Sequence, residues 1–187
     1  VEVKTGRIVA ITDAPSFNIK DPNTSYVNRA LEYAYEPGST MKTISMAIAL
    51  EEGVISEEET FDGSPFYFSV DKDGKAKRVT KNDKYSAVIN NPNKQVFKDM
   101  TYALGYQRSS NVMFVHLLVE RLNPEVYRDY MHRLGFFKPV GIDRFTEASG
   151  TELWNYPLEK ATNAFGQGSM VTMMQILQAH TAIFGDG

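Results

Sequence analysis

A serine and a lysine three residues apart are the strongest chemical signal in the sequence. Ser39 and Lys42 lie in the stretch Glu-Pro-Gly-Ser-Thr-Met-Lys at residues 36–42, where a proline and a glycine break the chain before a helix. Residues three apart lie on one face of a helix. A serine hydroxyl becomes a nucleophile when a neighbour accepts its proton, and a lysine with a lowered pKa can do this. The pair therefore predicts a serine nucleophile with a lysine base.

The helix expected from Ser39 to Glu52 supplies the environment that such a lysine needs. Residues 43–50 carry no charge, so we expect the helix to be buried nearly all round. Burial disfavours the ammonium form, and the positive end of the helix dipole disfavours it as well. Both effects lower the pKa of Lys42 and favour its role as a general base.

A second group of polar side chains follows seventy residues later, in the tripeptide Ser109-Ser110-Asn111. The hydroxyl of Ser109 could relay a proton beside a Ser/Lys pair, and the amide of Asn111 can donate to and accept from a peptide-like substrate. The same tripeptide could also cap a helix that begins near Val112. The two roles are compatible.

A second Ser-x-x-Lys match, Ser69 with Lys72, is not expected to be catalytic. It lies in a strand that runs into a turn, where residues three apart face opposite sides. The sequence therefore favours Ser39 over Ser69 as the nucleophile.

Short hairpins and helices must position these groups. Two hairpins are expected, one over residues 1–12 and one over residues 66–80 around Asp73-Gly74, with an irregular connection over residues 13–35. The helices expected after the first are two pieces within residues 97–122, a helix from Pro124 to about Gly135, and a last helix from the capping box at Thr172 to about Phe184.

Composition narrows the functional classes. The 187 residues are 42% hydrophobic, enough for one packed domain. Lys and Arg number 20 against 23 Asp and Glu, a net charge of −3, so we expect no nucleic-acid partner. The absence of cysteine excludes disulfides and thiolate metal sites, and the three histidines have no metal-ligand spacing. We expect no metal and no cofactor.

The residues at 36–42 followed by Ser-Ser-Asn resemble the transpeptidase domain of penicillin-binding proteins, and more closely its class B, monofunctional members. Other stretches agree in family order over nearly the whole chain: residues 3–10 resemble the first hairpin, residues 143–150 a linker, and residues 165–183 the run around Gly-Gln-Gly. The resemblance implies an α/β fold of the α+β type, β-lactamase/transpeptidase-like, with an antiparallel sheet flanked by helices and a mostly helical subdomain. Residues 1–187 would form the N-terminal and central part of one such domain.

The resemblance implies acyl transfer by a D,D-transpeptidase that cross-links peptidoglycan. Ser39 would attack the carbonyl between the two terminal D-alanines of a stem peptide, with Lys42 as the general base. Ser109 would relay a proton between Lys42 and the leaving amine, and Asn111 would bind the peptide amide. A β-lactam would acylate Ser39 in the same way.

The family's third motif, Lys-Thr-Gly or Lys-Ser-Gly on a strand that lines the site, is not found where it is expected. Lys4-Thr5-Gly6 precedes the nucleophile, so we reject it. Only 76 residues follow Asn111, and we expect the C-terminal strands of the sheet to be missing from this chain. Losing an oxyanion donor costs about 100- to 1,000-fold in rate, so the chain alone is expected to be impaired.

The resemblance also implies partners and a location. Peptidoglycan stem peptides and β-lactams would bind the site, and a membrane-embedded glycosyltransferase with a division or elongation complex would be the protein partners. No stretch is long enough to cross a membrane and residue 1 does not start a signal peptide. We expect the protein on the outer face of the cytoplasmic membrane, held by an anchor outside this chain.

Three alternatives remain open. A serine β-lactamase would need a carboxylate that activates water, and Glu147 and Glu152 are the nearest candidates. A non-catalytic β-lactam sensor would be acylated and signal. A wall-binding module would use neither Ser39 nor Lys42, so Ser39→Ala would leave its binding intact.

Overall fold

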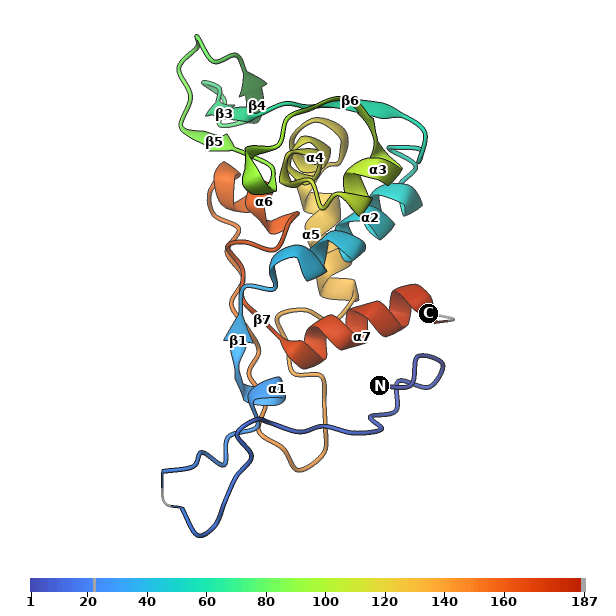
Figure 1. Ribbon diagram of the computed structural model, residues 1–187, viewed down its shortest axis with the longest axis vertical. Coiled ribbons are helices and arrows are strands. Elements are labelled where there is room, and N and C mark those ends of the chain that lie inside the picture. Colours follow the sequence, from blue (N-terminus) through green and yellow to red (C-terminus); the bar gives the residue numbers. More distant parts are fainter. Residues whose placement is uncertain (22, 186–187) are drawn as a thin grey trace.

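The computed structural model describes residues 1–21 and 23–185. The molecule is elongated, with most strands at one end, the central helices in the middle and the N-terminal segment at the other end (Figure 1). The first elements are α1 (Arg29–Glu32), β1 (Ala34–Tyr35), the 3₁₀ turn η1 (Gly38–Thr40), α2 (Met41–Glu51), β2 (Thr60–Gly63), β3 (Phe66–Val70), β4 (Ala76–Val79), β5 (Ala87–Ile89), η2 (Pro92–Lys94) and β6 (Phe97–Thr101). The rest are α3 (Tyr102–Gln107), α4 (Asn111–His116), the π-helical turn η3 (Leu117–Arg121), α5 (Pro124–Arg133), α6 (Pro157–Asn163), β7 (Val171–Thr172) and α7 (Met173–Phe184).

Helix α2 confirms the helix expected from Ser39 to Glu52, except that its first turn is the 3₁₀ turn η1. The uncharged run explains its burial, because seven of its eleven residues are buried. Gly53 ends it at φ +62°, a left-handed conformation that glycine adopts without strain. The helix therefore presents its N-terminal end to the site while its body lies in the core.

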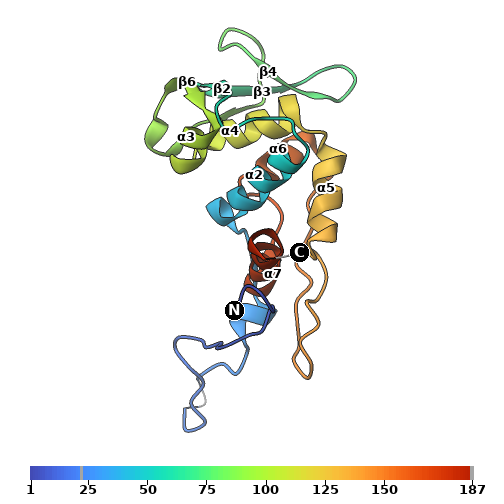
Figure 2. The same ribbon diagram turned by 90° about the vertical axis from the view of Figure 1, so that its right-hand side faces the viewer.

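The main core forms where α2 meets α4 and the strands. Phe66 and Phe68 of β3 are fully buried, whereas Tyr67 and Ser69, which alternate with them, are half-buried on the other face, as strand alternation requires. Phe114 of α4 is also fully buried. Figure 2 shows α4 crossing above α2 with the strands on its far side.

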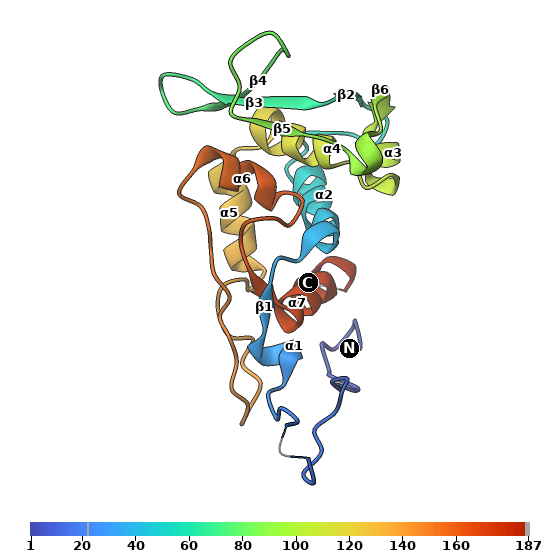
Figure 3. The same ribbon diagram turned by 60° about the vertical axis from the view of Figure 1, so that its left-hand side comes forward.

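The strands form small antiparallel sheets, as the fold class predicted. Strand β3 lies between β4 and β5, β2 pairs with β6, and β1 pairs with β7. The expected hairpin at residues 66–80 is confirmed, with Gly74 in its turn at φ +80°. In Figure 3 the three-stranded sheet covers α4. This sheet holds in place the helix whose first residue is Asn111.

The hairpin expected over residues 1–12 is wrong as a pair of strands. The turn forms, since the N–H of Gly6 donates to the carbonyl of Glu2 at 2.9 Å, but no strand is assigned on either side of it. Val3 and Val9 remain 45% and 67% exposed. A two-stranded hairpin that buries so little apolar surface is marginal by itself.

Residues 97–101 were expected to be helical, and they form β6 instead. Pairing with β2, with Phe61 opposite Met100, overrides the local preference. The two helical pieces then follow as α3 and α4. Helix α5 and the capped helix α7 confirm the later expectations. Helix α6 was not anticipated, although Pro157 at its start was an available signal.

Within residues 1–21 and 23–185, no helix has the length and apolar character of a membrane span.

Candidate active site

Ser39 lies in the 3₁₀ turn that leads into α2, and it is exposed. Gly38 before it has φ +57°, and its N–H donates to the carbonyl of Gly166 at 2.9 Å. A Cβ atom on Gly166 would lie 2.1 Å from the carbonyl oxygen of Gly38. The turn that carries Ser39 is therefore held against the Gly166 segment by a contact that only glycine permits.

Ser109, Ser110 and Asn111 join α3 to α4. Ser109 has φ +53°, and Ser110 caps α4 by accepting from the N–H of Met113 at 3.0 Å. Ser110 is fully buried, whereas its neighbours Ser109 and Asn111 are half-buried. Within the tripeptide, Ser110 therefore caps the helix, and Ser109 and Asn111 are the residues left for the candidate site.

Lys42 is the centre of the site. Its Nζ donates to the carbonyl of Ser109 at 2.7 Å, to the Oγ of Ser109 at 2.9 Å and to the Oδ1 of Asn111 at 2.6 Å. It also lies 5.7 Å from the ring centroid of Phe114. The residue is only 2% exposed, and burial lowers the pKa of the Lys42 ammonium to about 8. A substantial fraction of neutral amine is therefore available near pH 8.

Ser39 connects to Lys42 through Ser109. The Oγ of Ser109 donates to the Oγ of Ser39 at 3.2 Å, and the structure shows no direct hydrogen bond between Lys42 and the Ser39 hydroxyl, both of which it describes. When Lys42 is neutral, both bonds can reverse, so that Ser39 donates to Ser109 and Ser109 donates to Lys42. The arrangement can carry a proton from Ser39 to Lys42 through one hydroxyl.

The four residues expected at the site, Ser39, Lys42, Ser109 and Asn111, are all brought together. Asn111 differs from the expectation in one respect, because its Oδ1 already binds Lys42 and its Nδ2 donates to the carbonyl of Asn90 at 3.3 Å. Its amide therefore holds the lysine directly.

A buried polar network behind α2 was missed at the sequence level. The Oγ of Ser45 donates to the carbonyl of Ala164 at 2.7 Å and is 2.9 Å from the Oη of Tyr127. Burial raises the pKa of the Tyr127 hydroxyl, which stays neutral. Ser45, a lone polar residue in an apolar run, was the available signal. The network ties α2 to the segment that reaches Gly166.

The carboxylates considered for a β-lactamase are engaged elsewhere. Glu147 accepts from the backbone N–H groups of three consecutive residues, those at positions 140–142. Glu152 binds Arg128 at 2.7 Å and His132 at 3.0 Å, and these contacts lower the pKa of its carboxyl. Neither carboxylate is hydrogen-bonded to Ser39 or Lys42.

Ser69 lies in β3, the strand that the sequence predicts for it, and its hydroxyl donates to the carbonyl of Lys84 at 3.1 Å. The histidines make local contacts, such as that of His116 with Glu120 at 2.7 Å. Over residues 1–21 and 23–185 no group of three potential metal ligands is found.

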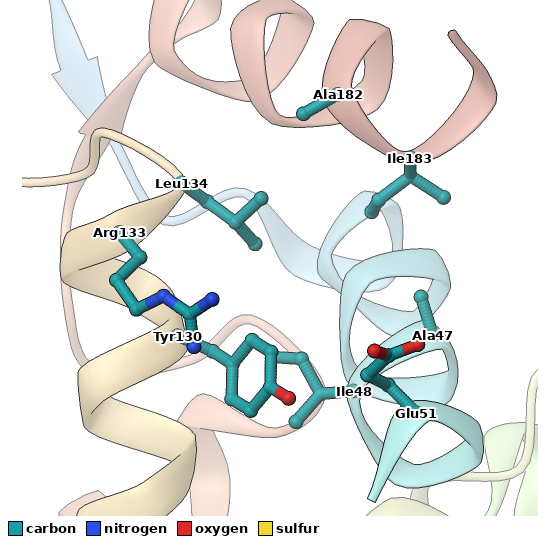
Figure 4. A pocket seen from close by; sticks show the side chains of 8 residues that line it. All are labelled: Ala47, Ile48, Glu51, Tyr130, Arg133, Leu134, Ala182 and Ile183. Carbon is teal, nitrogen blue, oxygen red and sulfur yellow. The ribbon is translucent and has the colours of Figure 1, made fainter. Parts of the chain in front are cut away.

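A pocket of about 530 Å³ lies away from this chemistry (Figure 4). It opens between α2, α5 and α7, with Glu51, Tyr130 and Ile183 among its lining residues. Glu51 is nine residues after Lys42, which is roughly 180° around the helix. The pocket and the Lys42 cluster therefore use opposite sides of α2.

This fold is that of the penicillin-binding protein transpeptidase domains. The sequence profile described as "Penicillin binding protein transpeptidase domain" matches residues 1–187, and the chain belongs to that family. The whole-chain match agrees with the resemblance and with the α+β fold that it implied.

Individual relatives agree with the family. The chain is 33% identical to "Peptidoglycan D,D-transpeptidase FtsI homolog" of Mesostigma viride, over 98% of this chain and 31% of the relative. It is 27% identical to "Peptidoglycan D,D-transpeptidase FtsI" of Escherichia coli K12, over 98% of this chain and 29% of the relative. The crystal structure of penicillin-binding protein 2X from Streptococcus thermophilus matches all of this chain and 26% of its own, with a TM-score of 0.79 and 28% identity. The chain thus spans about a third of the length of these curated relatives.

Proposed function

We propose that this chain carries the nucleophile and proton-transfer groups of a peptidoglycan D,D-transpeptidase that works through an acyl-serine intermediate. The observation that supports this most is the chain of hydrogen bonds from Lys42 through Ser109 to Ser39. The names of the relatives in Mesostigma viride and Escherichia coli supply the substrate class.

In the first half-reaction, Ser39 Oγ forms a bond to the carbonyl carbon between the two terminal D-alanines. Its proton passes through Ser109 to neutral Lys42. The C–N bond then breaks, and the leaving D-alanine amine takes a proton back from Lys42 through Ser109. Asn111 holds Lys42 in reach of this path and presents its remaining amide hydrogen toward the peptide.

In the second half-reaction, an amine of a neighbouring stem peptide attacks the ester carbonyl and releases Ser39. Lys42, neutral again, takes the proton of that amine and returns one to Ser39. A β-lactam enters the first half only, and its acyl group stays on Ser39 because Glu147 and Glu152 are engaged elsewhere.

The proposal also includes the location of the protein and its protein partners. The protein would act on the outer face of the cytoplasmic membrane, beside a membrane-embedded glycosyltransferase in a division or elongation complex.

Mass spectrometry of the intact protein after incubation with benzylpenicillin tests the proposal. We expect one stable added antibiotic mass, which Ser39→Ala abolishes. Ser69→Ala is the matched control, because it removes the other serine of a Ser-x-x-Lys pair and should leave acylation unchanged. An adduct that forms equally in Ser39→Ala would overturn the nucleophile assignment, and rapid loss of the adduct would favour a β-lactamase.

Formation of a cross-linked product from a D-alanyl-D-alanine donor peptide and an acceptor amine separates an enzyme from a sensor. We expect cross-linking that depends on Ser39. Acylation without any cross-linking in the intact protein would favour the sensor.

A further inference from the structure

Asn91 is a buried polar side chain close to the site that none of the roles above uses. It follows strand β5 and is only 4% exposed. Its Nδ2 donates to the carbonyl of Gly63 at 2.9 Å and to that of Gln95 at 3.0 Å. Its Oδ1 accepts from Ser110 Oγ at 2.7 Å and from the N–H of Val112 at 3.2 Å. Two donors and two acceptors are all that a side-chain amide offers, so this one is saturated.

The contacts of Asn91 reach the site through Ser110. Ser110 lies between Ser109 and Asn111, and these two neighbours supply all three oxygen atoms that bind Lys42 Nζ. The carbonyl of Asn90, next to Asn91, accepts from the amide of Asn111 at 3.3 Å. The Asn90-Asn91 segment therefore supports the tripeptide at two consecutive positions.

The backbone of the tripeptide needs this support. Ser109 has φ +53°, a left-handed conformation that residues other than glycine rarely adopt. Such a conformation persists only where the surroundings determine it strongly. The bonds from Asn91 to the Ser110 side chain and to the N–H of Val112 fix the first and the third residue after the strained one.

We propose that Asn91 is a positioning residue for acyl transfer, which holds Ser110 and Val112 and thereby keeps Ser109 and Asn111 around Lys42. Its effect on rate rests on the proposed function. The structural part of the proposal does not rest on that function: Asn91 keeps the three oxygen atoms of Ser109 and Asn111 in contact with Lys42 Nζ.

The experiment compares Asn91→Ala with Asn90→Ala in the intact protein. The two asparagines are neighbours, but Asn90 contributes only its main-chain carbonyl to the site, so its truncation is a matched control. Acylation by benzylpenicillin is measured as a function of concentration and pH, which separates the rate constant at saturation from the binding constant.

We expect Asn91→Ala to lower the saturating acylation rate by about 100-fold, the effect of displacing a catalytic group by about 1 Å. The binding constant should stay the same, because Asn91 does not touch the ligand. The pH midpoint of acylation should rise, because the displaced loop admits water to Lys42. Asn90→Ala should match the parent protein in all three quantities. A folded Asn91→Ala variant with the parental rate and pH midpoint would overturn the proposal.

A second variant covers the case in which Asn91→Ala does not fold. Asn91→Ser leaves room for a water molecule that can bind the carbonyls of Gly63 and Gln95, while Ser110 and Val112 still lose their direct acceptor. The same slower acylation and raised pH midpoint are expected. An Asn91→Ser variant with the acylation rate and pH midpoint of the parent protein would also overturn the proposal.

NMR titration of Lys42 with ¹³Cε-labelled lysine distinguishes failure of this inference from failure of the proposed function. This titration reports the pKa of Lys42 directly and does not require the protein to be acylated. If the parent protein is not acylated by any β-lactam, the proposed function fails. The positioning role then stands only if the Lys42 titration moves in Asn91→Ala and not in Asn90→Ala. An unmoved titration in a folded variant rejects it.

Discussion

Lys42 combines burial with three hydrogen bonds and a lowered pKa. Its ammonium has three oxygen partners, none of them a carboxylate, so it gains hydrogen bonds without the full counter-charge that would stabilise the charged form. Burial is the cause of its lowered pKa. A carboxylate in place of the Asn111 amide would raise the pKa again and remove the base from the neutral range.

The rate of acylation should therefore rise with pH and level off above pH 8. The base is the neutral amine, whose fraction falls about tenfold for each pH unit below the pKa of about 8. Stopped-flow acylation between pH 5.5 and 9.5 measures this. A flat profile across pH 8 would mean that Lys42 does not transfer the proton.

The same shift predicts a pH-dependent stability. The pKa of Lys42 is about 8 in the folded chain and 10.5 for an unperturbed lysine, so the unfolded chain binds the proton more tightly. The burial of the ammonium thus lowers the free energy of unfolding below pH 8. The free energy of unfolding rises again between about pH 8 and 10.5, because the folded state releases its proton at a lower pH than the unfolded state does.

Removing the base tests its role directly. Lys42→Ala should slow acylation of Ser39 by about 100- to 10,000-fold, the usual contribution of general-base catalysis. The fold should survive, because the variant also removes a buried charge. Lys72→Ala is the control, since Lys72 belongs to the unused Ser-x-x-Lys pair. Intact mass follows acylation and circular dichroism follows the fold; acylation of Lys42→Ala at the parental rate would reject the assignment.

At the scale of the elements, the site depends on the contact between the turn before α2 and the segment after α6. Gly38 and Gly166 both have positive φ and are hydrogen-bonded to each other. Ser45 and Tyr127 support the same junction from inside the core. The turn that carries Ser39 is therefore positioned by residues far later in the chain, up to 128 positions away for the Gly38–Gly166 contact.

Gly166→Ala should impair acylation far more than Gly168→Ala. Both glycines have left-handed φ, +81° and +108°, so both variants carry backbone strain. Only the Cβ of residue 166 would collide, at 2.1 Å from the Gly38 oxygen, whereas that of residue 168 would find its nearest neighbours at 3.6 Å. Relieving this collision has to move the turn that carries Ser39, and a displacement of about 1 Å costs about 100-fold in rate. Equal acylation rates in the two variants would show that the contact does not position Ser39.

At the scale of the whole molecule, stability is unevenly distributed. The main core joins α2, α4 and the three-stranded sheet, whereas a small second cluster around Leu31 and Met174 holds α1 and α7. None of the described residues between positions 9 and 28 is buried, and Ile19 and Tyr26 are 86% and 85% exposed. Local opening should follow this distribution.

Hydrogen exchange followed by mass spectrometry should show this order. Amides of residues 9–28 should exchange first, those of the β3–β4 hairpin later, and those of α2 and α4 last, because exchange follows burial and backbone hydrogen bonding. Slow exchange over residues 9–28 in the intact protein would show that another part of the protein covers this segment.

The sequence alone indicated the candidate reactive residues because the pattern that marks them is local. The spacing of Ser39 and Lys42, the uncharged run after them and the Asp73-Gly74 turn are each read within a few residues of chain. The resemblance then led to the family that the whole-chain match establishes. The roles of Ser39, Lys42, Ser109 and Asn111 in the reaction remain predictions.

Only the tertiary structure decided how these residues meet. The path from Ser39 through Ser109 to Lys42 joins positions about seventy residues apart, and the supports at Asn91 and Gly166 come from still other elements. Strand β6 differs from the local expectation because it pairs with β2, and residues 1–12 form no strands because their hairpin buries little apolar surface. Local patterns report the preference of a segment, whereas strand pairing, burial and a shifted pKa depend on neighbours distant in sequence that only the folded chain brings within a few ångströms.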